Sequence, residues 1–117
     1  MTMVNETILI KKGEKKTEIK KPGKLYKLMV ESERMAVNIA ELDPGSESRW
    51  FQHDGEEMHL VIKGEMEYTV GENTYKLNEG DILWHKSNLQ HKAKNVSNDK
   101  VVYITVSTPP TFKQSML

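Results

Sequence analysis

The chain has 117 residues, enough for one domain, with 37% hydrophobic and 29% charged side chains, a balance that is typical of a globular protein. Acidic and basic side chains are equal in number, so the formal net charge at pH 7 is zero, and the absence of cysteine excludes disulfides and thiolate metal sites. No apolar run approaches the roughly 18 residues that a membrane-spanning helix needs, so we expect no membrane partner.

The N-terminal segment is rich in lysine. Its first residues, MTMVNETILIKKGEKK, lack the basic and then apolar order of a secretory signal peptide, so we expect a cytoplasmic protein. The run KKGEKKTEIKKPGK over residues 11–24 could contact nucleic acid, but no aromatic residue is interleaved in it, and we predict no nucleic-acid partner. Lysine also protects exposed sheet edges. We therefore predict that residues 1–24 form an N-terminal arm or edge strand that packs on the barrel or on a partner chain.

Residues 25–117 are predicted to form a β-barrel. No window of a dozen residues sustains helical spacing, whereas short β-prone runs alternate with turns such as Asp43-Pro44-Gly45 and Gly71-Glu72-Asn73. With one run in the arm, the predicted strands are 7–10, 25–30, 35–42, 58–62, 66–70, 74–77, 81–85, 91–96 and 101–107. Strands this short and this regularly spaced indicate an all-β sandwich or barrel, whose closure hides its edges and leaves room for one small ligand.

The ionisable residues of the segment QHDGEEMH, residues 52–59, raise the question of a metal site. All histidines of the chain, His53, His59, His85 and His91, lie close together in the sequence. Imidazole is a standard ligand of first-row divalent metals, and Glu57 adds a carboxylate. Two imidazoles and one carboxylate leave coordination positions open, as in the non-haem Fe(II) oxygenases and in catalytic metal sites generally.

A first spaced pattern begins at Gly45. Five residues separate Gly45 from Phe51, and His53 follows two positions later. Three residues then lead to Glu57, and six more lead to Gly64.

A second spaced pattern begins at Gly80. Five residues separate it from Lys86, and Asn88 follows two positions later. Two residues then lead to His91, and three more lead to Asn95.

These two patterns resemble the two motifs of the cupin superfamily, as found in its small single-domain members and in the cupin effector domains of some helix-turn-helix regulators. This chain has no helix-turn-helix, so on the second comparison it would be only the sensor half. The resemblance covers residues 44–110. It implies a cupin-type jelly roll, also called a double-stranded β-helix barrel, with essentially no helix.

The resemblance implies that His53, Glu57 and His91 hold a divalent metal ion, which could be Fe, Mn, Ni or Zn, inside the barrel. Phe51 stands where the family has another histidine, and the alternation of the segment predicts that its ring forms an apolar wall beside the metal. Lys86 and Asn88 replace a proline and a glycine of the second motif. Asparagine tolerates the same backbone geometry as glycine, so the turn can survive.

Further residues are expected near the metal. Strand alternation places His59 on the same face as Glu57, where it either lines the pocket, orients Glu57 or serves as a core histidine. His59 and Tyr68 are the candidates for a general acid or base. We predict a pocket lined by Phe51, His59, Trp84 and His85, with structural or packing roles as the alternative for His85 and Trp84.

Together these features predict a metal-binding cupin that binds or converts a small polar molecule and forms a homodimer through sheet edges. If it is an enzyme, the reaction classes are oxygen-dependent oxidation at Fe(II), and isomerase or lyase chemistry at Mn, Ni or Zn. The alternative is a sensor module without turnover, with or without a metal. Fold alone does not decide between these functions.

Overall fold

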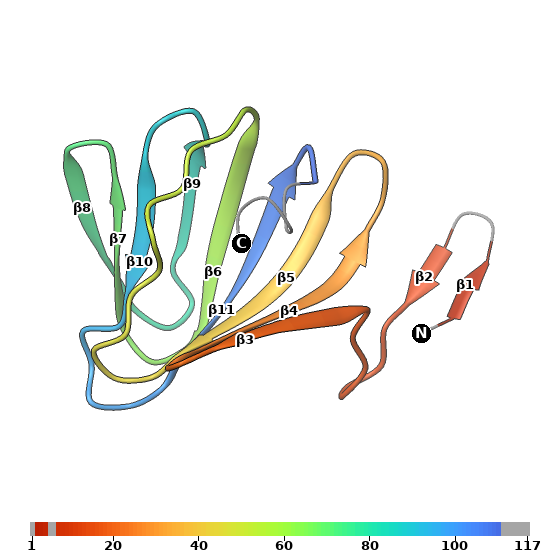
Figure 1. The fold of residues 1–117 in the computed structure, drawn as a ribbon, viewed down its shortest axis with the longest axis horizontal. Helices are drawn as coiled ribbons and strands as arrows, with labels where there is room; N and C mark the ends of the chain where they lie inside the picture. Colours follow the sequence, from red (N-terminus) through yellow and green to blue (C-terminus); the bar gives the residue numbers. More distant parts are fainter. Residues whose placement is uncertain (1, 5–6, 111–117) are drawn as a thin grey trace.

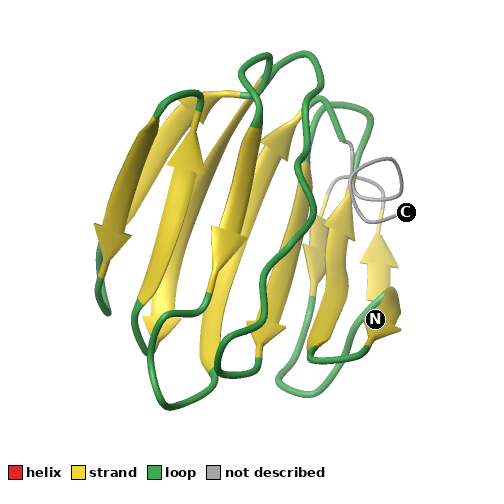
Figure 2. Ribbon diagram, turned by 60° about the vertical axis from the view of Figure 1, so that its left-hand side comes forward, coloured by secondary structure: helices red, strands yellow, loops and turns green. Residues whose placement is uncertain are grey.

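The structure is a computed structural model that describes residues 2–4 and 7–110. This part of the chain contains strands and turns but no helix (Figures 1 and 2), and therefore no helix that is long and apolar enough to cross a membrane. The strands are β1 (Thr2–Val4), β2 (Thr7–Leu9), β3 (Thr17–Lys21), β4 (Lys24–Glu31), β5 (Ala36–Leu42), β6 (Glu56–Lys63), β7 (Met66–Val70), β8 (Asn73–Leu77), β9 (Ile82–Lys86), β10 (His91–Lys94) and β11 (Val101–Thr108).

The strands form two main antiparallel sheets. The larger has the order β3-β4-β5-β11-β6-β9, the smaller has the order β10-β7-β8, and β1 pairs only with β2 (Figure 1). The buried core draws side chains from both main sheets, including Leu28 and Leu42 of the larger sheet and Met66 of the smaller. The fold is thus an all-β jelly-roll barrel, with no helix in residues 2–4 and 7–110, as the sequence predicted.

The interior of the barrel has an apolar end and a polar end. Side chains of β11 alternate strictly between buried and partly buried, and the buried ones run from Val101 and Tyr103 to Thr105 and Ser107. The strands on either side of β11 show the same change from apolar to polar residues. Val101 lies opposite Leu42 of β5, whereas Ser107 lies opposite Glu57 of β6. The candidate site residues lie at the polar end.

Each strand predicted from the sequence matches an observed strand, with bounds that differ by a few residues. Two observed strands were not predicted. One is β1. The other is β3, which pairs with β4 across a tight turn at Pro22 and Gly23 and ends the larger sheet. Part of the lysine-rich segment is therefore an edge strand of the larger sheet. The division of the chain into an arm (1–24) and a barrel (25–117) stays a prediction.

Candidate metal centre

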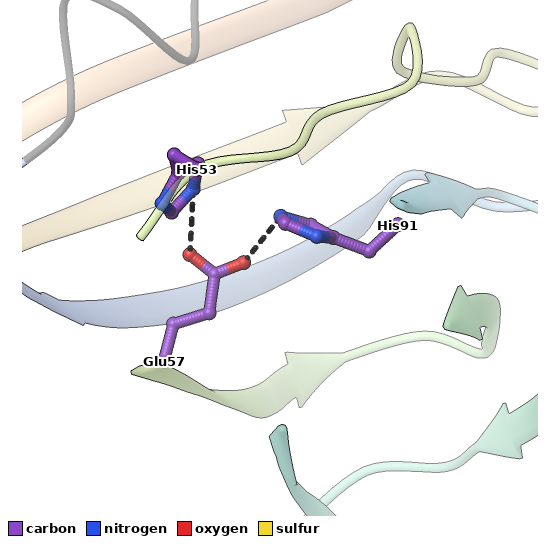
Figure 3. A group of neighbouring side chains, drawn as sticks. All are labelled: His53, Glu57 and His91. Atoms are coloured by element: carbon purple, nitrogen blue, oxygen red, sulfur yellow. Dashed lines mark ion pairs between the residues drawn. The ribbon is translucent and has the colours of Figure 1, made fainter. Parts of the chain in front are cut away.

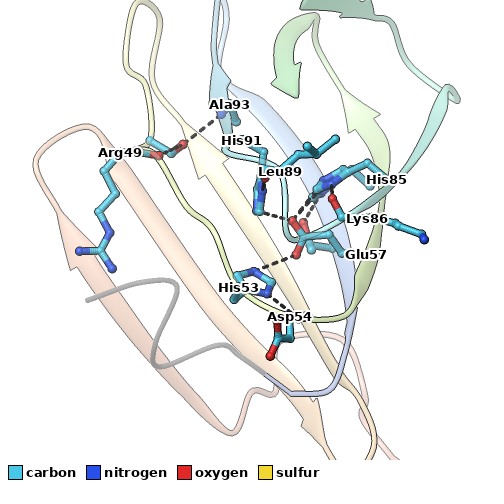
Figure 4. Close-up of polar contacts among 12 residues, drawn as sticks. Arg49, His53, Asp54, Glu57, His85, Lys86, Leu89, His91 and Ala93 are labelled. Atoms are coloured by element: carbon cyan, nitrogen blue, oxygen red, sulfur yellow. Dashed lines mark hydrogen bonds and ion pairs between the residues drawn. The ribbon is translucent and has the colours of Figure 1, made fainter. Parts of the chain in front are cut away.

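Four histidines surround the carboxylate of Glu57, which projects into the barrel from the start of β6. Figure 3 shows His53 and His91 beside it, and Figure 4 adds His85. Oε1 of Glu57 lies 2.8 Å from Nε2 of His91, 3.2 Å from Nε2 of His85 and 3.5 Å from Nε2 of His59. Oε2 lies 3.6 Å from Nε2 of His53. The structure therefore brings together His53, Glu57 and His91, and it adds His59 and His85 to them.

The histidines come from separate parts of the chain. His85 lies on β9 directly opposite Glu57 in the register, and His59 lies two residues beyond Glu57 on β6, on the same inward face. His91 opens β10 in the smaller sheet. The polar end of the barrel is thus the place where the two main sheets present ligating side chains to each other.

His53 precedes β6 in a loop that the backbone fixes. Its N–H donates to the carbonyl oxygen of Ser87 (3.0 Å), and the N–H of Ser87 donates to that of Gly55 (2.8 Å). Gly55 has a φ of +100°, and a Cβ there would overlap the backbone carbonyl of Thr108. Only glycine allows the chain this close an approach, which directs His53 toward the carboxylate.

Position 51 faces the same side of the barrel as His91. The two residues exchange backbone hydrogen bonds of 2.8 and 2.9 Å, and in such an antiparallel pair both side chains point to the same face. The ring centroids lie 6.1 Å apart. The side chain of Phe51 is partly buried and packs against the core. The first cupin motif has a histidine at this position, and a histidine here would point to the same face as His91.

Backbone carbonyls hold three of the four imidazoles through Nδ1. The contacts from His53 and His85 go to the carbonyl oxygen of the following residue, at 3.1 and 2.9 Å, and that from His91 goes to the carbonyl two residues earlier, at 2.8 Å (Figure 4). His59 differs, because its Nδ1 meets the hydroxyl of Thr105 at 2.8 Å. Contacts of this kind orient a ring and present its Nε2 inward.

The carboxyl group of Glu57 is held in its ionised form. Burial by itself would raise the pKa of Glu57, but hydrogen bonds with His59, His85 and His91 outweigh burial and lower that pKa below its ordinary value. Burial is the main cause that lowers the pKa of His59, although the nearby Glu57 carboxylate opposes it. An ionised carboxylate beside a neutral imidazole is an arrangement that suits a cation.

The two candidates for a general acid or base are both fully enclosed. The ring of His59 stacks on Tyr68 with centroids 4.1 Å apart, and its Nε2 lies 3.0 Å from that of His85. Burial, followed by the charge of Glu57, raises the pKa of Tyr68 well above its usual range, so its phenol stays protonated at neutral pH.

Trp84 does not line the pocket, and this expectation was wrong. Its side chain is 54% exposed, and its indole N–H donates to Glu56 at 3.2 Å on the outer face of the sheet. Successive residues of a strand point to opposite faces, so once His85 faces Glu57 its neighbour must face outward. The register between β6 and β9 decides this, and the sequence alone does not give that register.

Asn95, the last residue of the second motif, is fully buried and holds loops rather than facing the centre. Its Nδ2 donates to the carbonyl oxygens of Leu42 and Asp99 at 2.9 and 2.8 Å, and its Oδ1 accepts from the backbone and the hydroxyl of Ser97. This residue joins the end of β5 to the turn between β10 and β11.

Comparison with known sequences gives one family and a few relatives. Residues 38–107 match the model of the cupin domain. An uncharacterised protein of Archaeoglobus fulgidus is 34% identical over 64 residues, which cover 55% of this chain and 60% of that protein. The chain thus spans less than two thirds of that relative. An uncharacterised protein of Streptomyces coelicolor is 26% identical over 84 residues, which cover 72% of this chain and 80% of that protein.

Solved structures resemble the fold closely. KdgF from Halomonas sp. has a TM-score of 0.74 at 18% identity, with 84% of this chain and 92% of that chain covered. An RmlC-like cupin from Shewanella frigidimarina has a TM-score of 0.75 at 17% identity, with 88% and 92% covered. At such identities the likeness shows the fold alone.

Proposed function

The chain belongs to the cupin domain family, and from this premise we propose that it is a small metal-binding cupin in which His53, Glu57 and His91 hold a divalent metal ion and a small polar molecule is bound or converted. The observation that carries the proposal is the convergence of buried imidazole nitrogens on one ionised carboxylate at the polar end of the barrel.

The donor set fits such an ion. Nε2 of His53 is buried, has no hydrogen-bond partner in the described part of the chain, and faces Glu57 at 3.6 Å. A buried polar atom without a partner is costly, and a metal ion would satisfy it. Imidazole with carboxylate suits Fe, Mn, Ni and Zn. When bound, such an ion acts as a Lewis acid on a ligand oxygen.

A sensor role without turnover is the second candidate. The observation that favours it is the enclosure of His59 and Tyr68, because a group that transfers protons to a substrate must reach it. Elemental analysis of protein purified without added metal tests the metal site, which the sensor role does not require. A metal content near zero that added Zn²⁺, Mn²⁺, Ni²⁺ or Fe²⁺ does not raise would contradict the metal-binding function and leave the metal-free sensor.

We expect Phe51→His to strengthen metal binding, by about tenfold if the new ligand contributes roughly 1.4 kcal/mol. Position 51 points to the same face as His91, so a histidine there adds an imidazole to the site. The apo protein should become less stable, by less than the roughly 3–5 kcal/mol that truncation of a buried Phe to Ala costs, because one ring replaces another. Metal titration and thermal unfolding of the apo protein measure the two effects.

Phe51→Leu is the control for this variant. It also removes the aromatic ring but offers no nitrogen, so metal affinity should stay at the wild-type value. If Phe51→His folds and its affinity is equally unchanged, then position 51 does not reach the metal.

We also propose that two copies associate through the outer face of the larger sheet, including its β9 edge. Apart from charged residues such as Glu41, Glu56 and Lys86, the side chains that point outward there are apolar on four successive strands, and they are only partly buried or exposed in one copy. They are Val37, Ile39, Met58, Leu60, Ile62, Ile82, Trp84, Val102, Ile104 and Val106. A contiguous apolar face of this kind is typical of a protein–protein interface.

Ile82→Lys is expected to convert the dimer into a monomer, because Ile82 is 62% exposed in one copy and a lysine there would place a charge in the apolar interface. Light scattering during size-exclusion chromatography should show the mass halved. Tyr75→Lys is the matched control, since Tyr75 is also exposed but lies on β8 of the smaller sheet. A wild-type mass of one chain would refute this mode of association.

A further inference from the structure

We propose that His85 is a fourth protein ligand of the metal and supplies the imidazole that position 51 lacks. The inference rests on the proposed metal site and extends it from two imidazoles to three. It assigns a coordinating role to a residue of β9 that neither spaced motif includes. The position of the buried His85 ring and the contacts of its two nitrogens support this assignment.

The first step is the position of His85. Its ring is buried, and its Nε2 lies 3.2 Å from Oε1 of Glu57, the same oxygen that Nε2 of His91 approaches to 2.8 Å. The rings of His85 and His91 have centroids 4.6 Å apart. His85 therefore lies nearer to the carboxylate than the proposed ligand His53, which is 3.6 Å from it, and less near than the proposed ligand His91.

The second step concerns protonation. A carbonyl oxygen can only accept a hydrogen bond, so an Nδ1 that is bonded to a carbonyl must carry the proton of a neutral ring. This condition holds for His53, His85 and His91. Each of these rings, when neutral, therefore presents an unprotonated Nε2 toward Glu57, which is the form that coordinates a metal. A cation between the carboxylate and these nitrogens would take the place of the protons that join them in the metal-free centre.

The third step separates His59 from the other three. Its Nδ1 meets the hydroxyl of Thr105, which can either donate or accept, so no carbonyl fixes the proton on that side. When Nε2 of His85 is unprotonated, the 3.0 Å contact between the two Nε2 atoms makes His59 the donor. Nδ1 of His59 then accepts from Thr105. Once the lone pair of His85 binds a metal, Oε1 of Glu57 at 3.5 Å is the acceptor left for the proton of His59, so His59 is a positioning residue that orients the carboxylate.

The test uses Co²⁺ alone as the probe. X-ray absorption of the Co²⁺-loaded protein counts coordinated imidazoles, and competition with a chelator gives the affinity. We expect three imidazoles in the wild type and two in His85→Gln, with affinity lowered by at least about 100-fold. His59→Gln is the matched control: it should keep three imidazoles, and its affinity should fall by no more than the roughly 10–100-fold that loss of an outer-shell partner costs.

A rescue variant makes the assignment sharper. Phe51→His combined with His85→Gln should return the count to three and recover most of the affinity, because position 51 faces the same site. A rescued variant must also be folded, so this result excludes general damage as the cause of the loss in His85→Gln.

The outcomes distinguish the inference from the proposed function. A wild type that binds one Co²⁺ through two imidazoles would overturn the role of His85 and leave the proposed site intact, and this count needs no variant. Two bound Co²⁺ per chain would also overturn it, with His59 and His85 then belonging to a second site on Glu57. A wild type that binds no Co²⁺ or Zn²⁺ would overturn the metal site itself.

Discussion

Glu57→Gln is expected to lower the affinity for a divalent metal by at least about 100-fold, which corresponds to about 2.8 kcal/mol. Glu57 is the one buried acidic side chain in the described part of the chain, and every imidazole of the cluster points at it. Glutamine keeps the shape but removes the negative charge that offsets the charge of the ion. Chelator competition with Co²⁺ or Zn²⁺ measures the loss.

Glu56→Gln is the matched control for this experiment. Glu56 is the neighbouring residue of β6, but it is exposed and accepts a hydrogen bond from Trp84 on the outer face. Its replacement removes the same charge from nearly the same place in the sequence, and metal affinity should not change. Equal affinities in the two variants would mean that the Glu57 carboxylate is not a ligand.

Gly55→Ala is expected to lower the free energy of unfolding by about 2–4 kcal/mol. Gly55, which directly precedes β6, has a φ of +100°. A methyl group added there would overlap the carbonyl of Thr108 and the ring of Pro109. Relief of that overlap displaces the loop that carries His53, so metal affinity should fall as well. Urea unfolding of the apo protein and metal titration measure both losses.

Gly80→Ala separates backbone strain from steric overlap. Its φ of +87° is similar, but no atom lies within 4 Å of a Cβ at that position. This control should lose only the roughly 1–2 kcal/mol of the unfavourable backbone conformation and keep its metal affinity. Equal losses of stability in both variants would show that the contact with Thr108 is not what makes position 55 critical.

The sequence predicted the barrel well because half-buried strands leave a period of two in the residue pattern. Strands β5 and β11 show this pattern clearly, and the turn residues between strands marked their ends. Strand β3 was harder to recognise, since TEIKK contains one apolar residue, Ile19, and an edge strand packs little of its surface. Its pairing with β4 depends on tertiary contacts that local propensity does not encode.

The site was predictable where it follows the motif spacing and not where it depends on strand register. His53, Glu57 and His91 were named from spacing. The sequence analysis placed both His85 and Trp84 in the pocket, but neighbouring strand residues point to opposite faces. The pairing of β9 with β6, which places His85 opposite Glu57, decides that His85 faces inward and Trp84 outward. A shift of one residue in that pairing would exchange the two side chains, and no local signal in DILWH excludes the shift.

The division of the interior into an apolar end and a polar end has a consequence for how the barrel opens. Glu57 and His85 belong to the larger sheet and His91 to the smaller, so an ion held between them would tie the two sheets together where the apolar core does not reach. Without the proposed ion, we expect transient separation of the sheets, and the exchange of backbone amides with water, to be fastest at this end. The metal would then slow the separation of the two sheets and so lengthen the lifetime of the closed barrel, in addition to any chemistry that the metal performs.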